Sequence, residues 1–458
     1  MDYSLHHGSA WDLPKFDPKE FEKTMTARRA WVALVIFLLV VVNFMDRIAL
    51  AVAARPLVAA FGFTSVQLGY LFSAFLWTYV ICLVPLGLLN DKVKPKAMVG
   101  GAMAVWSAAT LLMGIVSSYG GMIVSRLLMG AGEAATFPAC GRVIRDWFPE
   151  RERGVVTALF NGGCQAGAAI GALFTAALVG WVGWRAPFVL LGILGFGWMF
   201  FWFAWYGSPK EVGWLSAAER LLLVEAHSAD EGQERISPAA SSLRFLLSHS
   251  SIWGIILTQA CLVYTAFLFL SWLPMFLETS RHLTEMQTGY WTAAPYILAV
   301  IFSVLIAHIS DRALSTADIK GGLRRNFVAI SAAMSLLILL ATVVTNVLGL
   351  LAVLTLVLTG CAGGAGLNFT LASDILENPR DVPTVFALTA FGGNLFGLAA
   401  PIITGYLIQG AGGYGIAFHV AGALLLCGLI LTLTLTRRPV PSQHAFVRIR
   451  EQLPVAPN

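Results

Sequence analysis

Long apolar segments recur along the whole chain and constrain its fold more than any other feature. A helix needs about 20 apolar residues to cross a bilayer. Only 12% of the residues are charged, against about 25% in soluble domains. The sequence therefore predicts an all-α membrane protein. Its twelve predicted transmembrane helices cover residues 30–52, 66–90, 97–118, 120–145, 154–180, 186–207, 252–277, 286–310, 326–346, 349–373, 384–409 and 415–436.

One long polar segment divides these helices into six and six. Such a division is typical of transporters whose two halves face each other across a central cavity. We therefore predict two six-helix bundles, with polar segments before, between and after them. The predicted limits are 1–29 for an N-terminal segment, 30–207 for the first bundle, 208–250 for a linker, 251–437 for the second bundle and 438–458 for a tail.

The basic residues indicate how the helices are oriented. Of the 30 lysines and arginines, 25 lie at the termini or in the loops after the even-numbered spans. Three lie on the other side (Arg55, Arg185 and Arg281), and Arg47 and Arg126 lie within spans. Because cytoplasmic loops carry the excess of basic residues, both termini are predicted to be cytoplasmic. The basic residues act as topology signals, which argues against a nucleic-acid partner.

Four charged residues lie deep inside apolar spans, away from the span ends: Asp46, Arg47, Arg126 and Glu133. A charge at bilayer depth costs roughly 2.5–3.5 kcal/mol on insertion scales and usually marks a ligand site or a proton pathway. Arginine can hold a carboxylate through two hydrogen bonds. The four residues therefore suggest a site that binds an anion and carries protons. The alternative is that they form structural salt bridges between helices.

Two sets of motifs resemble a known family. The loop from Gly87 through Asp91 to Lys92, with an echo at Asp311 and Arg312, resembles the cytoplasmic-loop signature of the major facilitator superfamily. Within the spans, the combined pattern closely resembles the anion:cation symporter family of that superfamily. This pattern comprises Asn43 to Arg47, Ser73 to Tyr79, Arg126 to Ala134, Trp147 to Gly154, Gly183 to Arg185, Ser373-Asp374 and Gly393 to Gly397.

The resemblance implies a major facilitator fold that works by alternating access and moves organic anions together with protons. Arg47 and Arg126 are then expected to contact the substrate, and Asp46 and Glu133 to carry the protons. Arg126 and Glu133 are seven residues apart and share one helix face, so we expect Arg126 to hold Glu133 when the site is empty.

Four polar residues within the spans are candidates for binding substrate hydroxyls: Tyr79, Gln165, Gln259 and Asn394. For each of them, a helix–helix hydrogen bond is the competing interpretation. The loop residues Gly87, Asp91, Lys92, Asp311 and Arg312 are expected to serve gating.

The stretch from Ser73 to Tyr79 resembles the sugar-acid branch of the family, which favours a hexonate, hexuronate or aldarate taken up by proton symport. Ala49 and Phe369 depart from the family pattern, so aromatic or small dicarboxylic acids and a proton-driven exporter stay open as alternatives.

An enzyme is not expected, because the chain has neither His-Glu-x-x-His nor Gly-x-Ser-x-Gly. No cofactor or metal motif is evident, so protons are the only expected coupling partner. The short loop after the first span, 53–65, has no glycosylation acceptor. We therefore predict a functional monomer embedded in the lipid of a bacterial inner membrane.

Overall fold

The structure is a computed structural model. It describes residues 18–443, except for 91, 216–218, 220–222, 224–240, 316–322 and 411–412. Much of the predicted linker and terminal segments, and the motif residue Asp91, therefore lie outside the described residues. The domain limits given above stay predictions.

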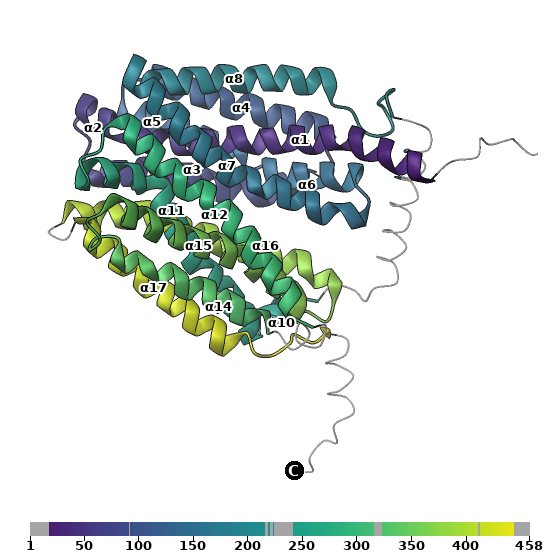
Figure 1. Ribbon diagram of the computed structural model, residues 1–458. Coiled ribbons are helices and arrows are strands. Elements are labelled where there is room, and N and C mark those ends of the chain that lie inside the picture. The colour runs from purple at the N-terminus through teal and green to yellow at the C-terminus, as the bar shows by residue number, and fades with distance from the viewer. Residues whose placement is uncertain are drawn as a thin grey trace, which may run out of the picture.

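The first half of the chain, which we call the N half, forms helices that run back and forth along one axis (Figure 1). In chain order they are α1 (Pro18–Val52), α2 (Ala54–Phe61), α3 (Ser65–Asn90), α4 (Pro95–Ile115), α5 (Tyr119–Glu133), α6 (Thr136–Trp147), α7 (Glu150–Val182) and α8 (Arg185–Trp205).

The second half of the chain, the C half, forms a second group of helices beside the first (Figure 1). They are α10 (Leu243–Leu247), α11 (Ser250–Ser280), α12 (Glu285–Ala313), α14 (Arg324–Ser335), the 3-10 helix η1 (Leu336–Leu340), α15 (Val347–Ile375), the 3-10 helix η2 (Pro379–Asp381), α16 (Val382–Gln409) and α17 (Gly413–Leu435).

Ten helices within the described residues are long and apolar enough to cross a membrane. The two remaining predicted spans are each built from two pieces, α5 with α6 and α14 with η1. The break after α5 lies at Ala134 and Ala135, where Pro138 has no N–H to donate to the carbonyl of Ala134. With these two, the described residues accommodate the twelve spans that the sequence predicts.

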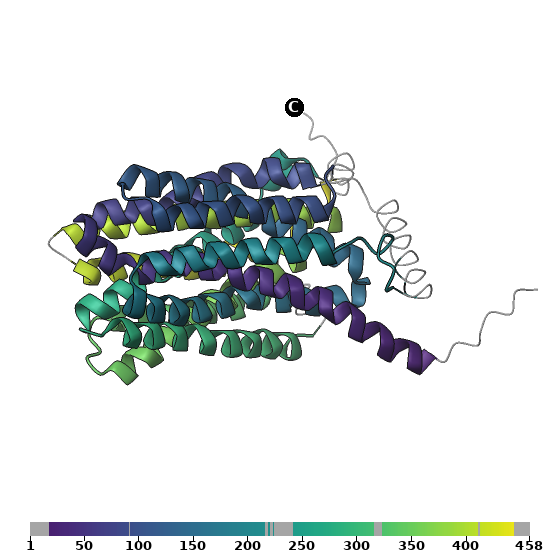
Figure 2. The same ribbon diagram turned by 90° about the horizontal axis from the view of Figure 1, so that it is seen from above.

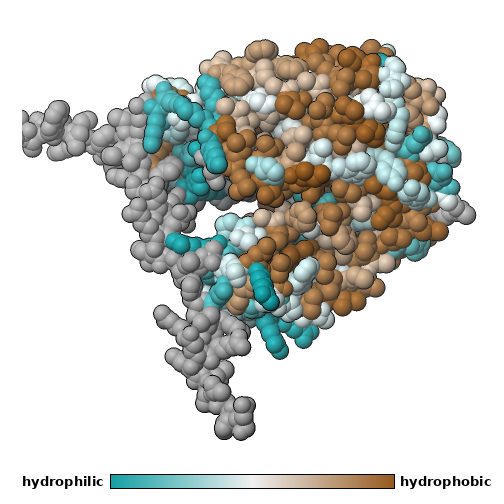
Figure 3. All heavy atoms as spheres, turned by 180° about the vertical axis from the view of Figure 1, so that it is seen from behind, coloured by the Kyte–Doolittle hydropathy of each residue, from teal (hydrophilic) through white to brown (hydrophobic). Residues whose placement is uncertain are grey.

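The outer surface of the molecule is strongly apolar, as a lipid-facing surface must be. Large apolar side chains such as Trp181, Phe200 and Val304 are 78%, 68% and 63% exposed. Figure 3 shows brown, hydrophobic residues over most of the outer face of both halves. A patch of this extent on a soluble monomer would favour association, so it supports burial in a bilayer.

The two ends of the molecule differ. Helix α1 begins at the end that also holds the end of α17, which we call the terminal end, and α2 lies at the opposite end, the far end (Figures 1 and 2). The C half slants away from the N half toward the terminal end (Figure 1). The space-filling surface is hollowed between the halves there (Figure 3).

At the far end the halves touch through small residues. A Cβ added to Gly69 of α3 would lie 2.6 Å from the carbonyl oxygen of Pro401 in α16. One added to Gly405 would lie 2.5 Å from the carbonyl oxygen of Ser65. Between α7 and α12, the corresponding distance from Gly289 to the Cβ of Ala176 is 2.6 Å. Side chains larger than hydrogen do not fit at these contacts, so glycine allows the far end to close.

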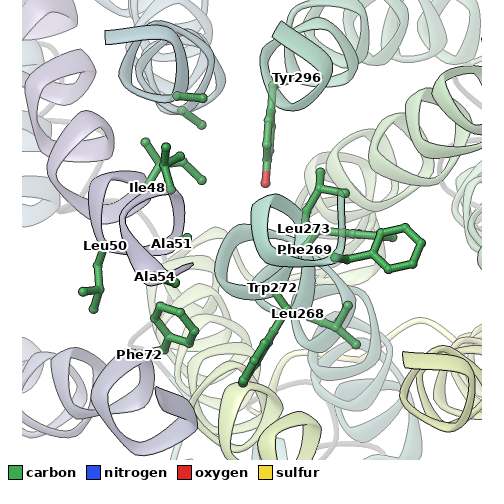
Figure 4. Packing of buried hydrophobic residues seen from close by; sticks show 14 of the residues in the cluster. Ile48, Leu50, Ala51, Ala54, Phe72, Leu268, Phe269, Trp272, Leu273 and Tyr296 are labelled. Carbon is green, nitrogen blue, oxygen red and sulfur yellow. The ribbon is translucent and has the colours of Figure 1, made fainter. Parts of the chain in front are cut away.

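Aromatic packing completes the closure. Trp272 of α11 meets Phe72 of α3 edge-on, with ring centroids 5.3 Å apart. The indole nitrogen of Trp272 donates to the carbonyl oxygen of Pro401 across 3.2 Å. Figure 4 shows Phe72 and Trp272 beside the contact between α1 and α11. The structure is therefore closed at the far end and open at the terminal end.

Candidate functional site

The four charged residues of the spans meet in the N half, where α1 and α5 face each other. Asp46, Arg47, Arg126 and Glu133 are 2%, 8%, 5% and 0% exposed. The Nε of Arg47 donates to Oε2 of Glu133 across 2.7 Å. The sequence therefore identified a real cluster of buried charges. The cluster consists of two guanidinium cations and two carboxyl groups on α1 and α5.

The pairing within this cluster differs from the expected one. Arg126 and Glu133 do lie on the same helix, α5, and both are buried. Among the described residues, however, the salt bridge to Glu133 is made by Arg47 of α1. The Nη1 of Arg126 instead donates to the sulfur of Met129 across 3.2 Å, a weak acceptor. Of the two arginines, Arg126 therefore has the weaker hydrogen-bond partner.

Aromatic rings surround both guanidinium groups. The Cζ of Arg47 lies 4.6 Å from the ring centroid of Phe44, 4.7 Å from that of Phe75 and 5.2 Å from that of Tyr79. The Cζ of Arg126 lies 5.4 Å from the ring centroid of Phe75. Such cation–π contacts stabilise a buried cation without neutralising it. The cluster therefore keeps its capacity to bind an anion.

Several polar atoms of the cluster lack a hydrogen-bond partner among the described residues. They are Nη2 of Arg47, Nε of Arg126, Oδ1 of Asp46 and Oε1 of Glu133. Buried polar groups are nearly always hydrogen-bonded, and each exception calls for an explanation. Two unpaired N–H groups on arginines match the acceptors of a carboxylate, and two unpaired carboxyl oxygens match protons or hydroxyl groups.

Arg47 and Arg126 line a small cavity between the halves. It also touches Phe75 on the N-half side and Phe267 and Ser271 of α11 on the C-half side. Its volume is about 10 Å³, roughly enough for one water molecule. A second cavity, with no room for a water molecule, is lined by Arg126, Asp46 and the hydroxyl-bearing Thr110 and Ser125. Arg126 therefore lies between Asp46 and the cavity that separates the halves.

The candidate hydroxyl-binding residues are placed differently from one another. Tyr79 joins the cluster through its ring contact with Arg47. Gln259 is buried in the C half, where its Oε1 accepts from Nδ2 of Asn368 across 3.0 Å. The Nδ2 of Asn394 donates to the carbonyl oxygen of Ala390 on its own helix, across 2.9 Å. Gln165 is half-buried on α7.

Gln165, Gln259 and Asn394 are not among the residues that line the two cavities. The structure thus brings Tyr79, and not these three side chains, to the charged cluster. For Gln259, the helix–helix hydrogen bond that the sequence left open as an alternative is formed.

The loop motifs lie at the terminal end. Lys92 and Arg312 are exposed, and nothing lies within 4 Å of a Cβ added to Gly87. Asp311 accepts from Nη1 of Arg324 across 2.6 Å. Arg324 also binds Asp374 through its Nε, again across 2.6 Å. The second copy of the motif therefore ties α12, α14 and α15 together at the open end.

Two polar residues of the C half were missed by the sequence analysis. The hydroxyl of Tyr296 in α12 is buried without a partner among the described residues, and it points away from α12 toward α11 (Figure 4). Both carboxyl oxygens of Glu278, near the end of α11, are likewise buried and unpaired. Glu278 could have been noticed in the sequence, because it directly follows the predicted span 252–277 and an acidic residue so close to a span can still be buried.

Comparison with known proteins places this arrangement in a class. The sequence profile of the Major Facilitator Superfamily matches residues 36–379. The chain belongs to this superfamily and is a multi-pass membrane transporter, not an enzyme. The superfamily resemblance that the motifs indicated is thereby confirmed.

Among its relatives are named transporters of sugar acids. The chain is 29% identical over 413 residues to the "D-galactonate transporter" of Escherichia coli O6:H1, covering 88% of this chain and 94% of the relative. It is 29% identical over 416 residues to the "Probable L-galactonate transporter" of Escherichia coli K12, covering 89% of each. A "Probable sulfoacetate transporter" of Cupriavidus necator is 28% identical, over 87% of this chain and 92% of the relative.

A solved structure shares the fold. It is a bacterial homolog of the human lysosomal transporter Spinster in an inward-facing and occupied conformation. The TM-score is 0.70 at 16% identity, and the match covers 89% of this chain and 97% of that one.

Proposed function

We propose that this protein imports a sugar acid, such as a hexonate, hexuronate or aldarate, together with protons. The observation that carries the proposal is the Arg47–Glu133 ion pair, which lies beside a second buried arginine, Arg126, that has no carboxylate partner among the residues the structure describes. The names of the relatives support a sugar acid as the substrate.

The charge balance of the cluster supports proton coupling. With Asp46 and Glu133 ionised, the two acids and the two arginines sum to zero, and an incoming carboxylate gains little. Protonation of Glu133 removes the competitor for Arg47, whose Nε and Nη2 can then hold the substrate carboxylate as a fork. Protonation of Asp46 leaves Arg126 uncompensated beside it. Proton binding and anion binding therefore favour each other, as linked equilibria require.

The remaining polar surface suits a substrate with many hydroxyl groups. Tyr79 contributes a phenol beside Arg47, and Thr110 and Ser125 lie beside Asp46. Aromatic rings such as Phe75 and Phe267 can pack on the apolar faces of a carbon chain. A small dicarboxylic acid would use both arginines and leave the hydroxyl groups unused, so it is the second candidate.

The proposed location is a bacterial inner membrane, with the terminal end in the cytoplasm, as the distribution of basic residues favours. In that orientation the structure is inward-facing, because the halves touch at the far end. The protein would act as a monomer and need no cofactor.

The test is uptake into proteoliposomes under an inward proton gradient. The substrates are radiolabelled galactonate, glucuronate, glucarate, phthalate and tartrate, and each is measured with and without the gradient. Arg126→Ala should abolish uptake, whereas Arg185→Ala, which removes an exposed arginine at the far end, should not. Uptake of tartrate or phthalate alone would overturn the sugar-acid assignment. Uptake that survives collapse of the gradient would overturn proton coupling.

A further inference from the structure

Glu278 is the most anomalous side chain outside the charged cluster. It is 2% exposed, and neither carboxyl oxygen has a hydrogen-bond or ion-pair partner among the described residues. Removing one partner of a buried ion pair typically destabilises a protein by several kcal/mol, because the remaining charge is uncompensated. A carboxylate in this position is therefore strongly disfavoured, whereas the neutral acid is tolerated. The closed far end holds a carboxyl group that fits there only with its proton bound.

The position of Glu278 in the fold connects it to gating. It lies seven residues beyond Ser271 on α11, hence on the same helix face, and Ser271 lines the cavity between the halves. Helix α11 packs against α1 and α2 of the N half at this end. Glu278 therefore faces the contact that must separate when the far end opens.

The charged and titratable groups around Glu278 come from three neighbouring helices. They are the basic Arg55 of α2, the acidic Glu285 of α12 and the phenol of Tyr414 of α17. Arg55 is exposed and forms no salt bridge with Glu278 in the described structure. Within the described part of the chain, the closed far end thus holds Glu278 out of water and without a neutralising ion pair.

We infer that Glu278 is a third proton-binding carboxyl group, and that its protonation permits the far end to close. Opening lets water reach the carboxyl group, which can then release its proton to the far side. Rebinding of a proton from that side removes the charge and allows α11 to pack again against α1 and α2. The closed far end and the protonated acid stabilise each other by linkage. A low pH on the far side would thus drive the transporter toward the conformation seen here.

The inference rests on proton coupling in the proposed function, but it can be tested without substrate. Ala60 of α2 and Leu348 of α15 are both exposed at the far end. Nitroxide labels on cysteines introduced at these two positions report the separation of the halves by double electron–electron resonance. The six native cysteines are replaced beforehand. The background also carries Asp46→Asn and Glu133→Gln, so that the central carboxyl groups do not contribute.

In this background the distance between the labels should lengthen as the pH rises from about 5 to 9. Glu278→Gln, which mimics the protonated acid, should keep the short distance at every pH. Glu278→Asp should keep a pH response, shifted by about one unit or less, roughly a tenfold change in proton affinity. Glu285→Gln is the matched control, because it removes a neighbouring carboxyl group from the same end; it should keep the pH response, shifted only slightly toward lower pH, since one negative charge near Glu278 is lost.

Two results would overturn the inference: an unchanged pH response in Glu278→Gln, or a background that shows no pH response. Neither depends on which anion is carried. If none of the substrates in the uptake assay is transported while the pH response disappears in Glu278→Gln, the proposed function fails and the role of Glu278 stands.

Discussion

Arg47 and Glu133 form a buried ion pair, 2.7 Å from Nε to Oε2, that joins α1 to the last residue of α5. Directly after Glu133 the span breaks at Ala134 and Ala135 and continues as α6. The carboxyl group that competes with a substrate for Arg47 is thus located at an interruption of its own helix. A change in its charge can alter both the ligand affinity of Arg47 and the link that this ion pair makes between α5 and α1.

The first prediction concerns this ion pair. Glu133→Gln keeps the size of the side chain but removes its charge, so Arg47 becomes free for a carboxylate at all pH values. Affinity for the sugar acid should weaken about tenfold or more, roughly 1.4 kcal/mol, between pH 5 and pH 8 in the unmodified protein. It should depend clearly less on pH in Glu133→Gln, where Asp46 is the carboxyl group of the cluster that still titrates. Isothermal titration calorimetry at pH 5 and pH 8 measures the affinity of the unmodified protein and of Glu133→Gln.

The same variant should lose proton-driven accumulation while it retains binding and exchange of substrate. Asp46→Asn serves as the comparison, because Asp46 lines the second cavity with Arg126 and does not bind Arg47 in the described structure. If binding in Glu133→Gln keeps the pH dependence of the unmodified protein, Glu133 is not the group that competes for Arg47.

Sequence reasoning located this cluster because charges in an apolar span can be recognised without any knowledge of packing. It did not identify the partner of Glu133, since that depends on how α1 is rotated against α5. Likewise, counting apolar residues gives twelve spans but ignores the missing N–H of Pro138, which breaks the fourth span into α5 and α6. Glu278 was missed because hydropathy places a boundary where charge begins, although the helix continues to Ser280.

The second prediction concerns the closed far end. Gly69→Leu places a branched side chain where only 2.6 Å separates a Cβ from the carbonyl oxygen of Pro401. This contact exists only when the halves touch, so the variant should fold but remain open at the far end. The label pair at Ala60 and Leu348 should show the longer distance at every pH, and uptake should be lost.

Gly197→Leu is the control for this variant, since nothing lies within 4 Å of a Cβ added to Gly197 on α8. It should resemble the unmodified protein in both measurements. A short label distance in Gly69→Leu would show that the contact between α3 and α16 can adjust and does not determine closure.

The third prediction tests an exposed ion pair outside the spans. Nζ of Lys94 donates to Oε1 of Glu211 across 2.8 Å, and this hydrogen bond is the main cause that lowers the pKa of Glu211 to about 2. A lowered pKa stabilises the fold above the ordinary pKa of 4.5, and the effect disappears as the pH falls from there toward 2. Because both groups are exposed, solvent screens most of it.

Glu211→Gln should therefore leave the melting temperature at pH 7 nearly unchanged and remove only a small pH dependence below about 4.5. Thermal unfolding in detergent, followed by intrinsic tryptophan fluorescence at pH 7 and pH 4, measures the difference. A large loss of stability at pH 7 would mean that the pair anchors the segment after α8 to the loop before α4 far more strongly than an exposed ion pair should.

The fourth prediction concerns a hydroxyl of the C half. The oxygen of Tyr296 is buried without a partner among the described residues and points toward α11 (Figure 4), so Tyr296→Phe removes a donor without opening a hole in the packing. If this hydroxyl binds the substrate when the halves enclose it, affinity should fall about 3- to 10-fold, the effect of one hydrogen bond of roughly 0.5–1.5 kcal/mol. Stability in the absence of substrate should be unchanged or slightly higher.

Tyr264→Phe is the matched control, because Tyr264 is also buried but lies beside Thr404 of the same half. Equal losses of affinity in the two variants would point to a general effect on the C half, whereas a loss confined to Tyr296→Phe would assign this hydroxyl to the substrate.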